Sequence, residues 1–115
     1  MKRLALTLDL VDDADAIAEY EAHHRAVWPE VEASFRASGI ERMEIFRVGT
    51  RLFMHLVVRD GFSFEAKAAR DAGDPKVVEW EALMERYQRR LPGTPDGAKW
   101  TPMTRIYRFQ DGRSE

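Results

Sequence analysis

The spacing of apolar residues changes several times along this chain of 115 residues, and the order of the changes constrains the fold. Residues 3–10 carry a leucine at every second position, which predicts a half-buried strand. Over residues 12–38 the apolar spacing becomes three and four, as on one face of a helix. Pro29 removes a helical hydrogen bond, so we expect a kink or a restart of the helix near Trp28-Pro29, and Gly39 is expected to end the helix.

The rest of the chain continues the alternation of strands and helices. The expected elements are a hairpin of strands 40–48 and 52–59, a short helix from Ser63 to about Asp71, a helix from Asp74-Pro75 with an apolar stripe to Leu91, a loop over 92–102 and a strand over 104–109. The order β-α-β-β-α-β predicts an α+β fold, a ferredoxin-like antiparallel sheet with helices on one face. We expect a single domain over residues 1–109 and a polar C-terminal tail over 110–115.

The composition excludes several classes of function. The chain has 18 Lys and Arg against 20 Asp and Glu, a net charge of −2, so we expect neither a nucleic-acid partner nor a membrane partner. It has no cysteine, which excludes thiol nucleophiles and thiolate metal sites. Asp9, Asp12 and Asp13 interrupt the apolar segment that a signal peptide needs, so a soluble cytoplasmic protein is expected.

The strands carry apolar residues on both faces. Phe53 and Val57 lie opposite Leu52, Met54 and Leu56 on the expected strand 52–59. A ferredoxin-like sheet leaves one face without helices, and an exposed apolar sheet face favours association. The sequence therefore predicts a homodimer that forms through the sheets.

An aromatic and histidine cluster on the helices is the strongest candidate site. Tyr20 and His24 are four residues apart, so a phenol and an imidazole lie side by side on one helix face. Trp28 and Trp80 can add flat apolar walls, and a proton-exchanging ring between aromatic planes suits a sugar. The alternative is that His24 is a core histidine bonded to the backbone, and His23 is expected to be solvated.

Two further residues have a structural and a functional interpretation. His55 lies on the face of Phe53 and is expected to be a bonded histidine of the sheet or dimer interface, outside the site. Glu81 follows Trp80 directly and is either a surface carboxylate or lies at the edge of the apolar stripe. The spacing of His and Glu matches no metal-ligand motif, so neither a metal nor a cofactor is expected.

The segment Tyr20-x-x-x-His24-x-x-x-Trp28-Pro29-Glu30 resembles the L-rhamnose mutarotase family. The resemblance covers most of the chain and includes the first strand, Gly39 with the strand after it, the run from Trp80 to Met84 and the last strand. It implies small dimers of ferredoxin-like subunits, of the dimeric α/β-barrel type, that interconvert the anomers of a 6-deoxy-hexose. It also implies that His24 is the proton donor, Tyr20 binds substrate, and Trp80 is the first of two tryptophans that contact the sugar.

Two positions depart from family members that act on L-rhamnose. Met43 stands where those members have a tyrosine, and Glu81 stands where they have the second tryptophan. Both positions belong to substrate contacts, so the resemblance implies the reaction more strongly than the sugar. We expect L-fucose to be favoured, with L-rhamnose second.

The expected mechanism is acid and base opening of the sugar ring without a cofactor. His24 is the expected acid at the ring oxygen, and the base is Glu81 or an ordered water. Fold alone does not distinguish this activity from a cofactor-free monooxygenase or a non-enzymatic dimer that binds a small ligand. A sugar site should converge several polar groups, whereas an oxygenase cavity should be mostly apolar.

Overall fold

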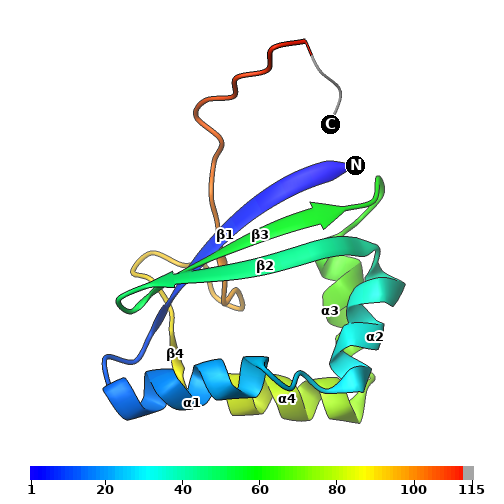
Figure 1. Ribbon diagram of the computed structural model, residues 1–115. Helices are drawn as coiled ribbons and strands as arrows, with labels where there is room; N and C mark the ends of the chain where they lie inside the picture. The colour runs from blue at the N-terminus through cyan, green and yellow to red at the C-terminus, as the bar shows by residue number, and fades with distance from the viewer. Residues whose placement is uncertain (113–115) are drawn as a thin grey trace.

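In the computed structural model, which describes residues 1–112, four helices lie on one face of a five-stranded antiparallel sheet (Figure 1). The elements are β1 (Lys2–Leu10), α1 (Ala14–His24), α2 (Pro29–Ser38), β2 (Ile40–Val48), β3 (Arg51–Val58), α3 (Phe64–Ala72), α4 (Pro75–Glu85), β4 (Gln88–Arg89) and β5 (Thr101–Pro102). The α+β, ferredoxin-like prediction is confirmed by this arrangement and by the structural relatives reported below. No helix within residues 1–112 is long and apolar enough to cross a lipid bilayer.

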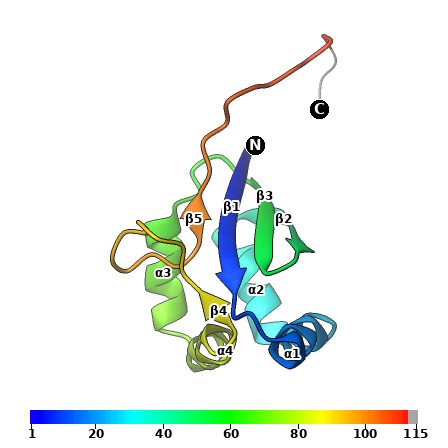
Figure 2. The same cartoon turned by 90° about the vertical axis from the view of Figure 1, so that its left-hand side faces the viewer.

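The fourth strand of the sheet is interrupted. The strand order is β2-β3-β1-β4, and β5 also pairs with β1. β4 pairs with Asp9 and Leu10, whereas β5 pairs with Leu6 and Thr7, and both run antiparallel to β1. The two short strands therefore follow one edge of β1, and residues 90–100 loop out between them (Figure 2).

The predicted kink separates two helices. α1 ends at His24, and α2 begins at Pro29. Trp28 has an extended backbone, with φ −65° and ψ 139°, because a residue before proline avoids the helical region. Gly39 ends α2 with φ 92°, a left-handed conformation that costs a glycine little, and the chain then enters β2.

The two faces of the sheet differ in cover. Leu8, Leu52 and Val58 point toward the helices and are almost completely buried. On the other face, the rings of Phe46 and Phe53 stack with centroids 6.0 Å apart, and no described helix covers them (Figure 1). His55 also lies in β3 on this face, as expected, with Nδ1 3.9 Å from a carboxylate oxygen of Glu44.

The predicted last strand over 104–109 is wrong. The final pairing involves only Thr101 and Pro102, and residues 103–112 leave the body as an extended arm (Figures 1 and 2). Ile106 is 95% exposed and Tyr107 is 78% exposed. The segment has the residue types of a strand, but strand propensity reflects packing against a paired strand, and no strand within residues 1–112 pairs with this segment. The expected tail over 110–115 begins in this arm, and residues 113–115 lie outside the described part of the chain.

The helix that follows Asp74 is shorter than its apolar stripe suggests. α4 ends at Glu85, although the stripe was expected to continue to Leu91. Tyr87 remains buried, but Gln88 leaves the helix because it pairs with Leu10 of β1. Tertiary pairing with the sheet therefore overrides the helical pattern at this point.

Candidate active site

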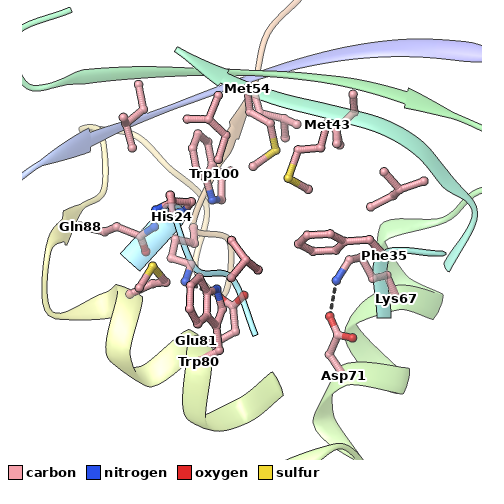
Figure 3. A pocket seen from close by; sticks show the side chains of 18 of the residues that line it. His24, Phe35, Met43, Met54, Lys67, Asp71, Trp80, Glu81, Gln88 and Trp100 are labelled. Atoms are coloured by element: carbon pink, nitrogen blue, oxygen red, sulfur yellow. Dashed lines mark hydrogen bonds and ion pairs between the residues drawn. The ribbon is translucent and has the colours of Figure 1, made fainter. Parts of the chain in front are cut away.

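A cavity of about 1270 Å³ lies between the sheet and the helices. Figure 3 shows the methionine side chains of Met43 and Met54 entering it from the sheet. His24 and Gln88 lie at one end, above α4 (Figure 3). At the opposite end lie the ring of Phe35 and the ion pair between Lys67 and Asp71 (Figure 3).

His24 is the last residue of α1 and lines the cavity. Its Nδ1 is 2.9 Å from the carbonyl oxygen of Tyr20, one turn earlier in the same helix. A carbonyl only accepts, so Nδ1 carries a proton and donates it. Proton exchange with a ligand must therefore use Nε2, which has no hydrogen-bond partner among residues 1–112.

The sequence-based alternative for His24 was a backbone-bonded core histidine. The backbone bond is present, but the imidazole also reaches the cavity and lies between two aromatic rings. Its centroid is 4.5 Å from that of Tyr20 and 5.8 Å from that of Trp80. The bond therefore orients the ring toward the cavity and fixes its tautomer.

Tyr20 is buried and lines the same end of the cavity. Its hydroxyl accepts a hydrogen bond of 3.1 Å from Nε2 of Gln88, so its own proton can be donated elsewhere. Burial raises the pKa of Tyr20 to about 12; the negative charge of Glu81 contributes to the rise, and the bond from Gln88 opposes it. Near neutral pH the residue is therefore a neutral hydrogen-bonding phenol.

Trp80 forms a wall of the cavity from α4, and Trp28 supports it from behind. The two indole rings meet at 5.2 Å with an interplanar angle of 69°. Trp28 is absent from the residues that line the cavity, and Lys76 lies over its ring at 5.8 Å. The structure places Trp28 against Trp80, because the break before Pro29 moves it away from the stripe of α1, and its expected sugar contact stays a prediction.

His23 is less exposed to solvent than expected. It is half-buried, and its Nε2 lies 3.2 Å from the hydroxyl of Tyr87. That hydroxyl also donates to Glu19 over 3.3 Å. α4 ends before Tyr87, and the Tyr87 hydroxyl therefore reaches His23. His23 lies on the side of α1 that the apolar stripe predicts to be exposed.

The two positions that depart from the L-rhamnose pattern both reach the cavity. Met43 lies in β2 opposite Leu56 and is half-buried. Glu81 lies on α4, where Lys99 donates to its carboxylate over 2.6 Å. Lys99 also lies 3.5 Å from a carboxylate oxygen of Glu85, and its side chain is only 15% exposed. The Glu81 side chain is 50% exposed and also lines the cavity, so its position fits both interpretations, a surface carboxylate and a residue at the edge of the stripe.

Several lining residues were not identified from the sequence. The loop 90–100 contributes Ala98, Lys99 and Trp100, because the interrupted strand returns to β1 beside the cavity. Lys67 and Asp71 have the i, i+4 spacing of a solvated surface pair. They line the far end of the cavity beside α2, whose Ser34 hydroxyl donates a hydrogen bond of 2.5 Å to the Asp71 carboxylate.

Comparison with known proteins identifies the family. The family model described as L-rhamnose mutarotase matches residues 3–109. The L-fucose mutarotase of Xanthomonas campestris pv. campestris is 51% identical over 116 residues, covering 99% of this chain and 93% of that protein.

Two solved structures share the fold. The crystal structure of an L-rhamnose mutarotase from Formosa agariphila has a TM-score of 0.70 at 19% identity and covers 96% of this chain and 100% of that one. Tetracenomycin F2 cyclase from Streptomyces glaucescens has a TM-score of 0.58 at 17% identity, with 96% and 98% covered. At these identities the two structures support the fold and not the activity. The match of the family model to nearly the whole chain carries the assignment: the chain belongs to the L-rhamnose mutarotase family and is a sugar mutarotase, an isomerase.

Proposed function

We propose that the chain interconverts the α and β anomers of L-fucose, with His24 as the residue that exchanges the proton. The choice of L-fucose as the substrate rests on the 51% identity to an L-fucose mutarotase over nearly the whole length. The orientation of His24 supports its role, because the bond from Nδ1 to Tyr20 leaves Nε2 to the cavity.

The reaction is a reversible ring opening in which nothing is consumed. The imidazolium form of His24 gives the proton on Nε2 to the ring oxygen, and the bond between C1 and that oxygen breaks. The anomeric hydroxyl loses its proton to Glu81 or a water, so C1 becomes an aldehyde. Rotation about C1–C2 and reversal of the steps close the ring as the other anomer. Proton transfer by one positioned group typically contributes roughly 10²–10⁴-fold.

The cavity residues support a 6-deoxy sugar. Trp80 offers a flat apolar surface for the C–H face of the ring, and Met43 offers apolar contact for the C6 methyl group. Glu81 is a charged acceptor for sugar hydroxyls that is anchored by Lys99. We infer that Met43 and Glu81, which replace the Tyr and Trp of members that act on L-rhamnose, favour L-fucose. A sugar with a misplaced hydroxyl would leave polar groups of the site unpaired.

The direct test is anomer exchange measured by saturation transfer at the anomeric proton. L-fucose, L-rhamnose and glucose are compared at matched concentration with the same protein sample. We expect exchange in the order L-fucose, L-rhamnose, glucose. Faster exchange of L-rhamnose than of L-fucose would refute L-fucose as the preferred substrate, and the proposed mutarotase activity would stand.

The rival functions make a different prediction in the same experiment. A cofactor-free monooxygenase or a non-enzymatic ligand-binding dimer would exchange none of these sugars. The cavity receives polar groups from His24, Glu81 and Gln88, but most of its lining surface is apolar, so its polarity does not separate the two functions. The match to the mutarotase family carries the choice between them.

The sugar preference can also be tested by substitution. We expect the double variant Met43→Tyr with Glu81→Trp to shift the exchange ratio toward L-rhamnose, because it restores the residues of members that act on that sugar. The two single variants are the controls. An unchanged ratio with retained exchange would mean that other residues set the preference.

We propose further that the protein acts as a homodimer in the cytoplasm. The bare sheet face with Phe46 and Phe53 and the exposed arm with Ile106 and Tyr107 are apolar surfaces that a second copy can cover. Sedimentation tests the dimer, as described in the Discussion. Fractionation of cells that express the chain tests the compartment.

A further inference from the structure

The strongest unexplained feature of the cavity is a buried oxygen without a partner. Oε1 of Gln88 is buried and accepts no hydrogen bond from residues 1–112. A buried acceptor that is left without a hydrogen bond destabilises the folded protein. Gln88 lines the cavity beside His24, so a hydroxyl of a bound molecule can supply the missing bond (Figure 3).

The amide is held in place by its neighbours. Its backbone pairs with Leu10 of β1 at the start of the interrupted strand. Its Nε2 donates to the hydroxyl of Tyr20 over 3.1 Å, which orients Oε1 as the free acceptor. Since the oxygen of Tyr20 accepts this bond, the phenolic proton is available to a ligand.

We propose that Gln88 is a substrate-binding residue that, with Tyr20, recognises one hydroxyl on C2, C3 or C4 of the sugar. That hydroxyl donates to Oε1 of Gln88 and accepts the proton of Tyr20. A donor and an acceptor side by side select an O–H group over a C–H group at that position. This inference rests on the proposed sugar mutarotase activity and adds a recognition residue to it.

The test combines one substitution with monodeoxy sugars. Gln88→Met keeps the length of the side chain and removes both hydrogen bonds. We expect it to lower kcat/KM for L-fucose roughly ten-fold, mainly through KM. For the one deoxy sugar that lacks the recognised hydroxyl, the same substitution should have little further effect. Rates of the 2-, 3- and 4-deoxy forms of L-fucose are compared as ratios of variant to unmodified protein.

The control separates recognition from support of Tyr20. Gln110→Met makes the same chemical change in the C-terminal arm, away from the cavity, and should leave the rates unchanged. Equal losses with L-fucose and with all three deoxy sugars would mean that Gln88 only positions Tyr20, which overturns the proposal. An unchanged kcat/KM would overturn it as well. Absence of exchange by the unmodified protein would instead refute the mutarotase activity, so the two failures are distinct.

Discussion

At the scale of single residues, the proposed proton exchange by His24 depends on a backbone bond. A free imidazole samples two neutral tautomers, whereas the bond from Nδ1 to the carbonyl of Tyr20 selects one. The position of Nε2 relative to Trp80 is then determined by the helix, not by a flexible side chain. Residues on helices are positioned more accurately than residues on loops.

We expect His24→Gln to reduce anomer exchange by about 10²–10⁴-fold while the protein remains folded, because the amide cannot exchange protons near neutral pH. Exchange is measured by saturation transfer and folding by far-UV circular dichroism. His55→Gln is the matched control, since His55 lies on the opposite face of the sheet. His23 is a poorer control than the sequence suggested, because it bonds to Tyr87. Equal rates for the two glutamine variants would show that another group supplies the proton.

Tyr20 should control part of the stability at alkaline pH. Its pKa in the folded protein is about 12, above the value near 10 of an exposed tyrosine. Between these values the unfolded chain loses the phenolic proton and the folded chain keeps it, so the free energy of unfolding falls as pH rises. The slope approaches about 1.4 kcal/mol per pH unit between the two pKa values, and it fades within roughly one pH unit below 10.

Urea unfolding at pH 9 and pH 11 checks this prediction. Tyr20→Phe should lose less stability over this interval than the unmodified protein, by about 1–2 kcal/mol. Tyr107→Phe is the control, because Tyr107 is 78% exposed. Parallel losses in all three proteins would mean that Tyr20 ionises equally in both states.

At the scale of elements, local signals predicted the helices well. Ser63 and Asp74 accept backbone N–H bonds as the expected caps, Pro29 begins α2, and Gly39 ends it. Asp13 caps α1 in the same way, although it was not among the expected caps. These signals act within a few residues, so they can be read from the sequence. The helical spacing of Tyr20 and His24 likewise predicted that the two side chains are neighbours, and the resemblance to the family placed Trp80 in the same site.

The rest of the site depends on contacts between distant segments. Gln88 and Trp100 reach the cavity only because β4 and β5 pair with separate parts of β1. Lys99 lies in a segment rich in proline and glycine, which indicates a loop but not the partner of the loop. Such residues cannot be found from periodicity.

We expect Lys99→Met to raise KM for L-fucose about 2- to 5-fold with little change in kcat. Lys99 holds the carboxylate of Glu81 at the cavity, and an ion pair of this exposure contributes roughly 0.2–1 kcal/mol. Lys99→Arg should restore most of the affinity. Lys76→Met is the control, because Lys76 pairs with Glu79 on α4 away from the cavity. A fall in kcat alone would contradict a role in holding the sugar.

At the scale of the whole molecule, the fold leaves two apolar surfaces uncovered. The bare face of the sheet includes Phe46, which is 53% exposed, and the arm includes Ile106 and Phe109. The predicted strand at 104–109 does not form, because no strand within the described residues 1–112 pairs with it. A second copy can provide one, which connects the failed prediction with the proposed dimer.

Sedimentation of the unmodified protein at micromolar concentration should give a dimer. Phe46→Glu should raise its dissociation constant at least about ten-fold, because it introduces a charge into a desolvated apolar contact. Val78→Glu makes the same change at an exposed apolar residue of α4 and should leave the dimer intact. A stable monomer of the unmodified protein would remove the proposal.

The interruption of the fourth strand has a consequence for how such an enzyme can diversify. β4 and β5 each keep their own register with β1, so residues 90–100 can vary in length or sequence without shifting either pairing. The same segment presents Lys99 and Trp100 to the cavity, whereas His24 belongs to a different element. If His24 transfers the proton as proposed, selectivity and reactivity are separable in inheritance, and new loops at this position can explore other sugars while His24 stays unchanged. The segment is therefore the natural target for a randomised library.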